Sequence, residues 1–203
     1  ASECCHASWA MVSPARSPIF SPSVNAPLML ARGKISYASY WAISAFPAAI
    51  LQPPFFDPKA DPAVNYGGIG ADIAHEISHH FDDQGAKYDE YGRLNEWWTE
   101  ADKKAFEAAG KSLIAQYDAY EIFPGANVKG AFTLGENIGD LAGLTIAYDA
   151  WKHSLGGQEA PVLDGTTGDQ RSYLGWAQVW RRNYREANLR QRLITDPHSS
   201  SEQ

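Results

Sequence analysis

The 203-residue chain is poor in cysteine, in basic residues and in long apolar runs. Its two cysteines, Cys4 and Cys5, are adjacent, which excludes a disulfide framework and does not resemble a metal-binding pair. The 17 Lys and Arg residues are outnumbered by 24 Asp and Glu residues, and the net charge of −7 argues against nucleic acid or an anionic membrane as a partner. No stretch is apolar for long enough to span a bilayer, and the first thirty residues lack the pattern of a signal peptide.

What the chain does contain is enough apolar material for one core. Hydrophobic residues make up 44% of it and aromatic residues 12%, which suits a single domain. Apolar periodicity predicts helices over about residues 68–81, 99–120, 133–154 and 169–193. Thr99-x-x-Asp102 opens the second helix, and Thr195-Asp196-Pro197 ends the last. Arg181 and Arg182 are expected on a solvated face, with the lining of a cleft as the alternative.

A short extended segment precedes these helices. It runs from about Ala45 to Gln52 and is closed by Pro53-Pro54. It is expected either to form an edge strand, which could pair with an extended peptide, or to be an internal strand that covers the core. The fold class predicted is therefore mainly α (α+β), with a helical core and a small edge-strand element.

The pentapeptide His75-Glu76-Ile77-Ser78-His79 carries the strongest chemical signal. Residues four apart lie one above the other on a helix, so His75 and His79 can bind one Zn²⁺. Glu76 lies about 100° round the helix, off the metal but beside a water, where it can act as a general base. His80 points away from His79 and is expected at the rim of the site rather than among the ligands.

The alternative for this pentapeptide is a chance match on an ordinary amphipathic helix. Ile69, Ile73, Ile77 and Phe81 form an apolar i, i+4 stripe, and the two histidines fall roughly opposite it. One face of the helix is therefore suited to a core and the other to a cleft.

A catalytic zinc site needs a third protein ligand, and Gly135-Glu136-Asn137-Ile138-Gly139-Asp140 offers one. Glu136 and Asp140 are again four apart, and the small residues Gly143 and Ala147 continue their face, which would allow close helix packing. Glu136 could complete a His, His, Glu set, and Asp140 could accept the second N–H of a liganding imidazole. The alternative is a capping box, Thr133-x-x-Glu136, in which the glutamate only caps a backbone N–H.

These segments together resemble the neprilysin family of zinc metallopeptidases, peptidase family M13. The resemblance covers about residues 46–199. It is carried by Phe46–Phe56, Asn65–Gly70, His75–Gly85 and Gly135–Asp140, and it continues in the family's order through Asp164-Gly165, Thr167–Arg171, Ala177–Arg181 and Thr195–Ser199.

The resemblance implies a zincin-like metallopeptidase fold, one bound Zn²⁺ and peptide substrates. It implies His75, His79 and Glu136 as zinc ligands, with Glu76 as catalytic base. It further implies Asp140 as the group that orients a liganding histidine and His198 as the group that stabilises the oxyanion. For His198 the alternative is a frayed residue near the end of the chain.

The departures from the family pattern concern both ends of the chain. Asn25-Ala26 corresponds to a substrate-binding pair, but the residues that follow it are foreign and the spacing is too long, so this assignment is weak. Residues 1–45 match poorly and are expected to be partly disordered, with the incomplete catalytic domain spanning 46–203. The chain ends where family members continue with a substrate-binding arginine.

We therefore expect the catalytic third of a longer zinc endopeptidase or oligopeptidase. By resemblance it acts outside the cytoplasm, as a secreted, periplasmic or membrane-anchored enzyme. The alternative is a catalytically incompetent fragment that acts only as a zinc- or peptide-binding module.

Overall fold

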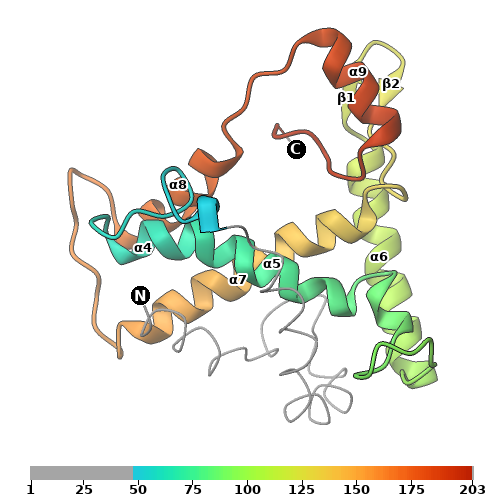
Figure 1. Cartoon of the computed structure of the whole chain (residues 1–203), viewed down its shortest axis with the longest axis horizontal. Coiled ribbons are helices and arrows are strands. Elements are labelled where there is room, and N and C mark those ends of the chain that lie inside the picture. The colour runs from blue at the N-terminus through green and yellow to red at the C-terminus, as the bar shows by residue number, and fades with distance from the viewer. Residues whose placement is uncertain (1–47, 203) are drawn as a thin grey trace.

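The structure is a computed structural model, and it describes residues 48–202. Helices α5 and α7 cross at the centre of the molecule (Figure 1). Helices α4 and α8 lie on one side of this crossing, and α6, the β1–β2 hairpin and α9 lie on the other (Figure 1). The helices are α4 (Pro62–Asn65), α5 (Ala71–Ser78), α6 (Glu100–Asp118), α7 (Leu134–Ser154), α8 (Gly168–Trp180) and α9 (Glu186–Thr195).

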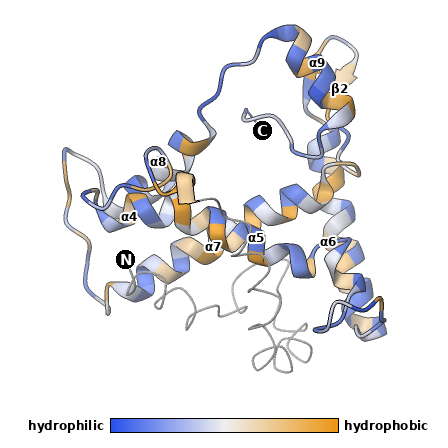
Figure 2. Ribbon diagram, in the orientation of Figure 1, coloured by the Kyte–Doolittle hydropathy of each residue, from blue (hydrophilic) through white to orange (hydrophobic). Residues whose placement is uncertain are grey.

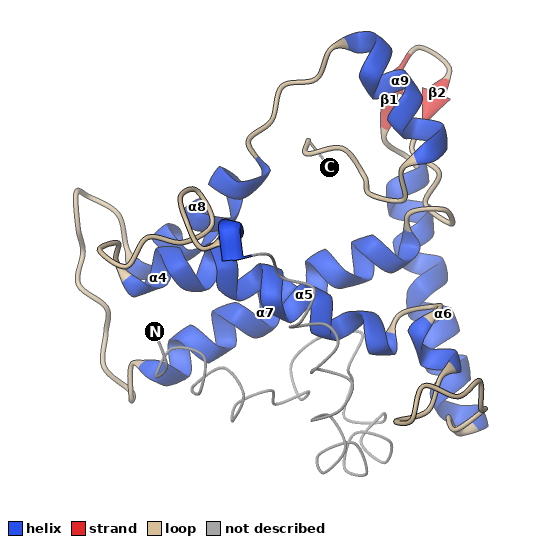
Figure 3. Cartoon of the chain, in the orientation of Figure 1, coloured by secondary structure: helices blue, strands red, loops and turns tan. Residues whose placement is uncertain are grey.

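Strand structure within residues 48–202 is confined to one small hairpin (Figure 3). Strands β1 (Glu121–Phe123) and β2 (Ala126–Asn127) are antiparallel, and Gly125 in the turn has φ 74°. The mainly α prediction with a small strand element is confirmed. No described helix is both long and apolar enough to cross a membrane.

The helix that carries the histidines begins earlier than the sequence predicted. Pro62 opens α4, a π-helical segment (Tyr66–Gly70) leads into α5, and a 3₁₀ turn (His79–Phe81) ends the run. Proline is well suited to the first turn of a helix because its missing N–H has no intrahelical partner there. The predicted stop is confirmed, because Asp82 is extended.

Helix α5 packs closely on α7 because α7 presents glycine at the contact. A Cβ on Gly143 would lie 2.5 Å from the carbonyl oxygen of Ala71 and 2.8 Å from the amide nitrogen of His75. A Cβ on Gly139 would lie 2.8 Å from the ring of His75. The small residues expected to allow close helix approach are therefore found where α7 meets the histidine helix.

The buried apolar residues form separate clusters along α7. Its C-terminal half contributes Ala150 and Trp151, which pack with Ala63 and Tyr66 from the α4 side. Its N-terminal half contributes Leu134 and Ile138, which pack with Leu113 of α6. Hydrophobic residues lie along the crossing of α5 and α7, whereas the connection from α8 to α9 is hydrophilic (Figure 2).

Two local predictions were wrong. Within the expected strand at 45–52, the described residues 48–50 form a 3₁₀ turn, and no described segment pairs with them as a strand. The expected helix over 169–193 is two helices, because Arg181 is extended with ψ 92°. No glycine or proline lies between α8 and α9, so the break has no local sequence signal.

A buried arginine fixes the start of α8 to the start of α4. The side chain of Arg171 donates to the Asp61 carboxylate and to the carbonyl oxygens of Thr166 and Pro161. The helix itself begins in a complete capping box between Thr167 and Gln170. These contacts anchor the first turn of α8, and its last turn, with Val179 and Trp180, lines the pocket described below.

Candidate metal centre

Helix α5 presents His75 and His79 as a pair. Their ring centroids are 4.7 Å apart and the rings meet edge to face. His75 is buried, and His79 is half-buried. One ligand atom each from His75, Glu76 and His79 lies within 4.8 Å of the others, so these three groups could hold a metal ion. His80 donates from Nδ1 to the carbonyl oxygen of Ile77 in the preceding turn.

A carboxylate is hydrogen-bonded to Nδ1 of each of these two histidines. Nδ1 of His75 lies 2.8 Å from Oδ1 of Asp140, and Nδ1 of His79 lies 2.8 Å from Oδ2 of Asp82. Such pairs fix the proton on Nδ1, orient the ring and leave Nε2 for a metal. Asp82 is itself held by the backbone N–H groups of Gln84 and Gly85.

Glu136 brings α7 into the site. Its Oε2 lies 3.2 Å from Nε2 of His75, 3.6 Å from Nε2 of His79 and 3.0 Å from Nε2 of His198. The capping-box alternative is wrong, because Thr133 makes no side-chain cap. Its hydroxyl instead donates to the carbonyl of Lys129 and accepts from Asn137.

His198 reaches the same carboxylate from the segment after α9. Asp196 accepts from both Nδ1 and the backbone N–H of His198 and forms a 2.6 Å ion pair with Arg192. The next residue, Ser199, donates to Oδ1 of Asn137 at 2.7 Å. Asn137 is fully buried in α7, so the same helix holds Glu136 and anchors the His198 segment.

The electrostatics of the site follow from these contacts. Burial lowers the pKa of His75, but its hydrogen bonds to Asp140 and Glu136 outweigh burial and raise the pKa to about 10. Burial raises the pKa of Glu136, but hydrogen bonds from His198 and His75 hold it well below its usual range. The hydrogen bond to Glu136 raises the pKa of His198. The cluster therefore keeps the Glu136 carboxylate ionised beside the imidazoles of His75 and His198.

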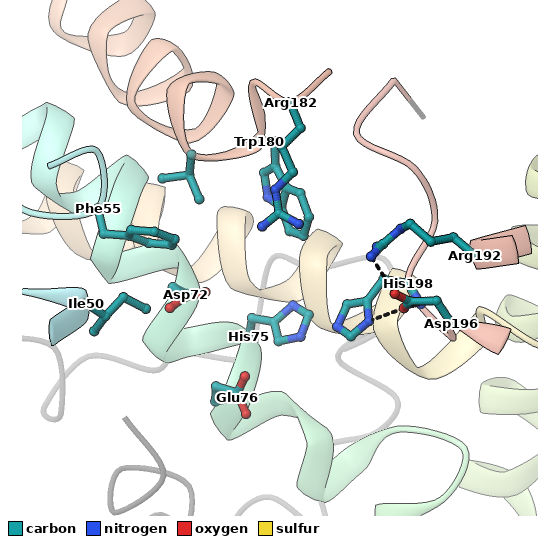
Figure 4. A pocket seen from close by; sticks show the side chains of 11 residues that line it. Ile50, Phe55, Asp72, His75, Glu76, Trp180, Arg182, Arg192, Asp196 and His198 are labelled. Carbon is teal, nitrogen blue, oxygen red and sulfur yellow. Dashed lines mark hydrogen bonds and ion pairs between the residues drawn. The ribbon is translucent and has the colours of Figure 1, made fainter. Parts of the chain in front are cut away.

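A pocket of roughly 380 Å³ lies beside these groups (Figure 4). His75, Glu76 and His198 line it on the side of the histidine pair. Ile50, Phe55, Val179 and Trp180 supply apolar walls, and Asp72, Arg182, Arg192 and Asp196 add charge. Arg182 thus takes the alternative position expected for it, lining a pocket.

The structure brings together the candidate residues from three segments of the chain. His75, Glu76 and His79 come from the α5 end, Glu136 and Asp140 from α7, and His198 from the C-terminal segment. Asn25 and Ala26, the candidate substrate-binding pair, lie outside the described residues.

Sequence reasoning missed three acids at this site. Asp82 follows His79 by three residues, and Asp196 precedes His198 by two, so both pairings had a local signal in the spacing. Asp72 precedes Glu76 by four residues, which places both carboxylates on one helix face.

The crossing of two helices that carry a His-Glu-x-x-His segment and an opposing glutamate places the chain in the zincin-like class of folds. Peptidase family M13 matches residues 37–203, and the chain belongs to this family.

Relatives with known names agree with this assignment. Endothelin-converting enzyme 1 of Rattus norvegicus is 37% identical over 196 residues, which cover 95% of this chain and 23% of the relative. Neprilysin-11 of Caenorhabditis elegans is 42% identical over 160 residues, covering 76% of this chain and 19% of the relative.

The fold has solved counterparts. Zinc metalloprotease Zmp1 of Mycobacterium tuberculosis, in complex with an inhibitor, superposes with a TM-score of 0.75 at 60% identity, over 77% of this chain and 25% of that one. PepO of Lactobacillus rhamnosis gives a TM-score of 0.66 at 41% identity, over 77% of this chain and 23% of that one. The chain thus spans about a quarter of the length of the proteins it matches.

Proposed function

We propose that this chain forms the zinc-binding catalytic part of an endopeptidase or oligopeptidase that hydrolyses peptide bonds. The observation that carries the proposal is the convergence of Nε2 of His75 and Nε2 of His79 on one oxygen of Glu136. Both Nδ1 atoms are already hydrogen-bonded to carboxylates, so the Nε2 atoms are the ones that would bind a metal ion.

This donor set fits Zn²⁺. Two imidazoles and one carboxylate are a ligand set of catalytic zinc sites, in which a fourth position stays open. His75, His79 and Glu136 would hold the ion, and Asp140 and Asp82 would orient the two rings. When bound, Zn²⁺ would supply Lewis-acid polarisation of a peptide carbonyl and lower the pKa of a water toward about 7.

Glu76 is the proposed general base. It lines the pocket next to His75, and its carboxylate can take a proton from a water held in the pocket. The same carboxyl group would then pass this proton to the leaving amine nitrogen. We assign Glu136 rather than Glu76 as the ligand because its Oε2 contacts both Nε2 atoms.

His198 is the proposed donor to the developing charge on the carbonyl oxygen. Its Nε2 faces the centre of the site, and Asp196 fixes Nδ1. One such donor is typically worth about 2.7–4 kcal/mol of transition-state stabilisation. The substrates would be peptides, and by its relationship to family M13 the enzyme would act outside the cytoplasm.

Two glutamate substitutions test this division of roles. Glu76→Gln should keep zinc affinity nearly intact and abolish hydrolysis, whereas Glu136→Ala should weaken zinc binding itself. Zinc content after dialysis and cleavage of a quenched fluorescent peptide library, with and without chelator, measure both properties. Glu107→Gln on α6, away from the site, is the control and should change neither. Loss of metal in both site variants, or in neither, would refute the assignment.

A further inference from the structure

The pocket beside the metal centre has apolar walls and an acidic group among them. Ile50, Phe55 and Val179 contribute hydrocarbon, and Asp72 rises from α5 beside Ile50 and Phe55 (Figure 4). The pocket's volume of roughly 380 Å³ is more than ten times the share of one water, about 30 Å³, so it can take a long side chain.

Asp72 is close to the chemistry without taking part in the metal site. It precedes His75 by three residues and Glu76 by four, so it lies on the helix face that carries the proposed base. A side chain that occupies the pocket between Asp72 and Glu76 would therefore belong to a residue next to the bond that is cleaved.

The Asp72 carboxylate forms no hydrogen bond or ion pair with any residue between 48 and 202. It is half-buried, and burial raises its pKa to about 6 even though the charges of His75 and Arg182 act to lower it. A half-buried carboxylate without a partner is unfavourable, and a cation brought by a ligand would relieve it.

The other charges around the pocket have partners. Arg192 is paired with Asp196 at 2.6 Å, and Asp196 also holds His198. The guanidinium of Arg182 lies over the ring of Trp180, 5.0 Å from its centroid. Among the pocket charges outside the metal site, Asp72 is thus the one that has no ion-pair or ring partner in the described chain.

We propose that this pocket selects a lysine or arginine side chain of the peptide substrate, at the residue next to the cleaved bond, with Asp72 as the specificity-determining residue. The methylene stem of such a side chain packs on Phe55 and Val179 while its charge meets the carboxylate. An acidic side chain is rejected by like charge, and an apolar one leaves Asp72 without a partner. The proposal rests on the proposed peptidase function, since that function makes a peptide the ligand.

Binding to the zinc-loaded chain carrying Glu76→Gln tests the preference without cleavage. The probes are octapeptides of alanine and glycine that carry a single lysine or, as an uncharged match in length, a single norleucine at the same position. Calorimetry should give a lysine preference of about tenfold, which corresponds to about 1.4 kcal/mol. Adding Asp72→Asn should bring the two dissociation constants together, and Asp72→Val should favour norleucine.

Two further variants sharpen the result. Asp149→Asn on α7 removes the same charge from a half-buried acid outside the pocket and should leave the preference unchanged. Arg182→Gln removes the competing cation near Asp72 and should increase the preference.

The outcomes separate this proposal from the proposed function. Equal binding of both peptides, no binding of either, or a lysine preference that survives Asp72→Asn overturns the role of Asp72, even if the wild-type chain cleaves peptides. A lysine preference that depends on Asp72 supports it, even if the wild-type chain proves unable to hydrolyse any peptide. In the second case only the catalytic proposal fails.

Discussion

Gly143→Ala should separate the two helices that form the candidate metal centre. The new Cβ would start 2.5 Å from the carbonyl oxygen of Ala71, and Cβ contacts under 3.0 Å essentially never occur. The helices must therefore move apart by at least about 0.5 Å at this point, and the obstacle is backbone rather than a flexible side chain. The movement draws His75 away from Glu136.

The sizes of the expected losses in stability and in zinc affinity follow from the packing. Overfilling a tight contact typically destabilises a protein by about 1–3 kcal/mol. A shift of this size at His75, a proposed ligand, should weaken zinc binding by roughly tenfold, at the lower end of the effect of disturbing groups that support a metal ligand. Urea unfolding without zinc and competition with a chromophoric chelator measure the two quantities.

Gly110→Ala on α6 is the matched control. Its Cβ would meet Leu134 at 3.6 Å, an ordinary contact, and alanine inside a helix is typically favoured over glycine by about 0.5–1 kcal/mol. The two substitutions should thus change stability in opposite directions, and Gly110→Ala should leave zinc affinity as it is. If Gly143→Ala stabilised the chain and kept its zinc affinity, close packing of α5 on α7 would not be what holds the site.

Two shorter predictions concern protonation. The zinc-free chain should lose stability as the pH rises from 6.5 towards about 10. The pKa of His75 is raised in the folded state, so the contribution of this residue to the free energy of unfolding is complete only below pH 6.5. Thermal melts in chelator measure this loss, and Asp140→Asn should flatten the dependence of stability on pH. Ser199→Ala should lower the pKa of His198 toward its ordinary value, because the lost bond to Asn137 loosens the contact with Glu136; NMR titration measures it, and an unchanged pKa would contradict the anchoring role of Ser199.

The sequence predicted the parts of the structure that depend on residues close together in the chain. Four-residue spacing on a helix is enough to pair His75 with His79 and Glu136 with Asp140, whatever the rest of the chain does. The cap at Thr99 is likewise local, and its side chain accepts from the backbone of Asp102 as expected.

The parts that were missed depend on distant contacts. Tyr184 continues the four-residue spacing of Trp176 and Trp180, yet the helix ends at Trp180. There Trp180 and Arg182 line a pocket with Ile50 and Phe55, which lie far earlier in the chain. Residues 48–52 were expected to be extended, but a strand requires a partner ladder, and the described chain supplies none.

Helix α7 explains how the site can combine residues of α5 with residues of the C-terminal segment. Glu136 and Asp140 face α5, while the adjacent Asn137 is buried and bonds to Ser199 in the C-terminal segment. Consecutive residues on a helix point about 100° apart, so one short stretch can bind two segments at once. A change at Asn137 would therefore displace His198 while leaving the histidine pair on α5 in place, and this separability is why the anchoring of His198 can be tested independently of zinc binding.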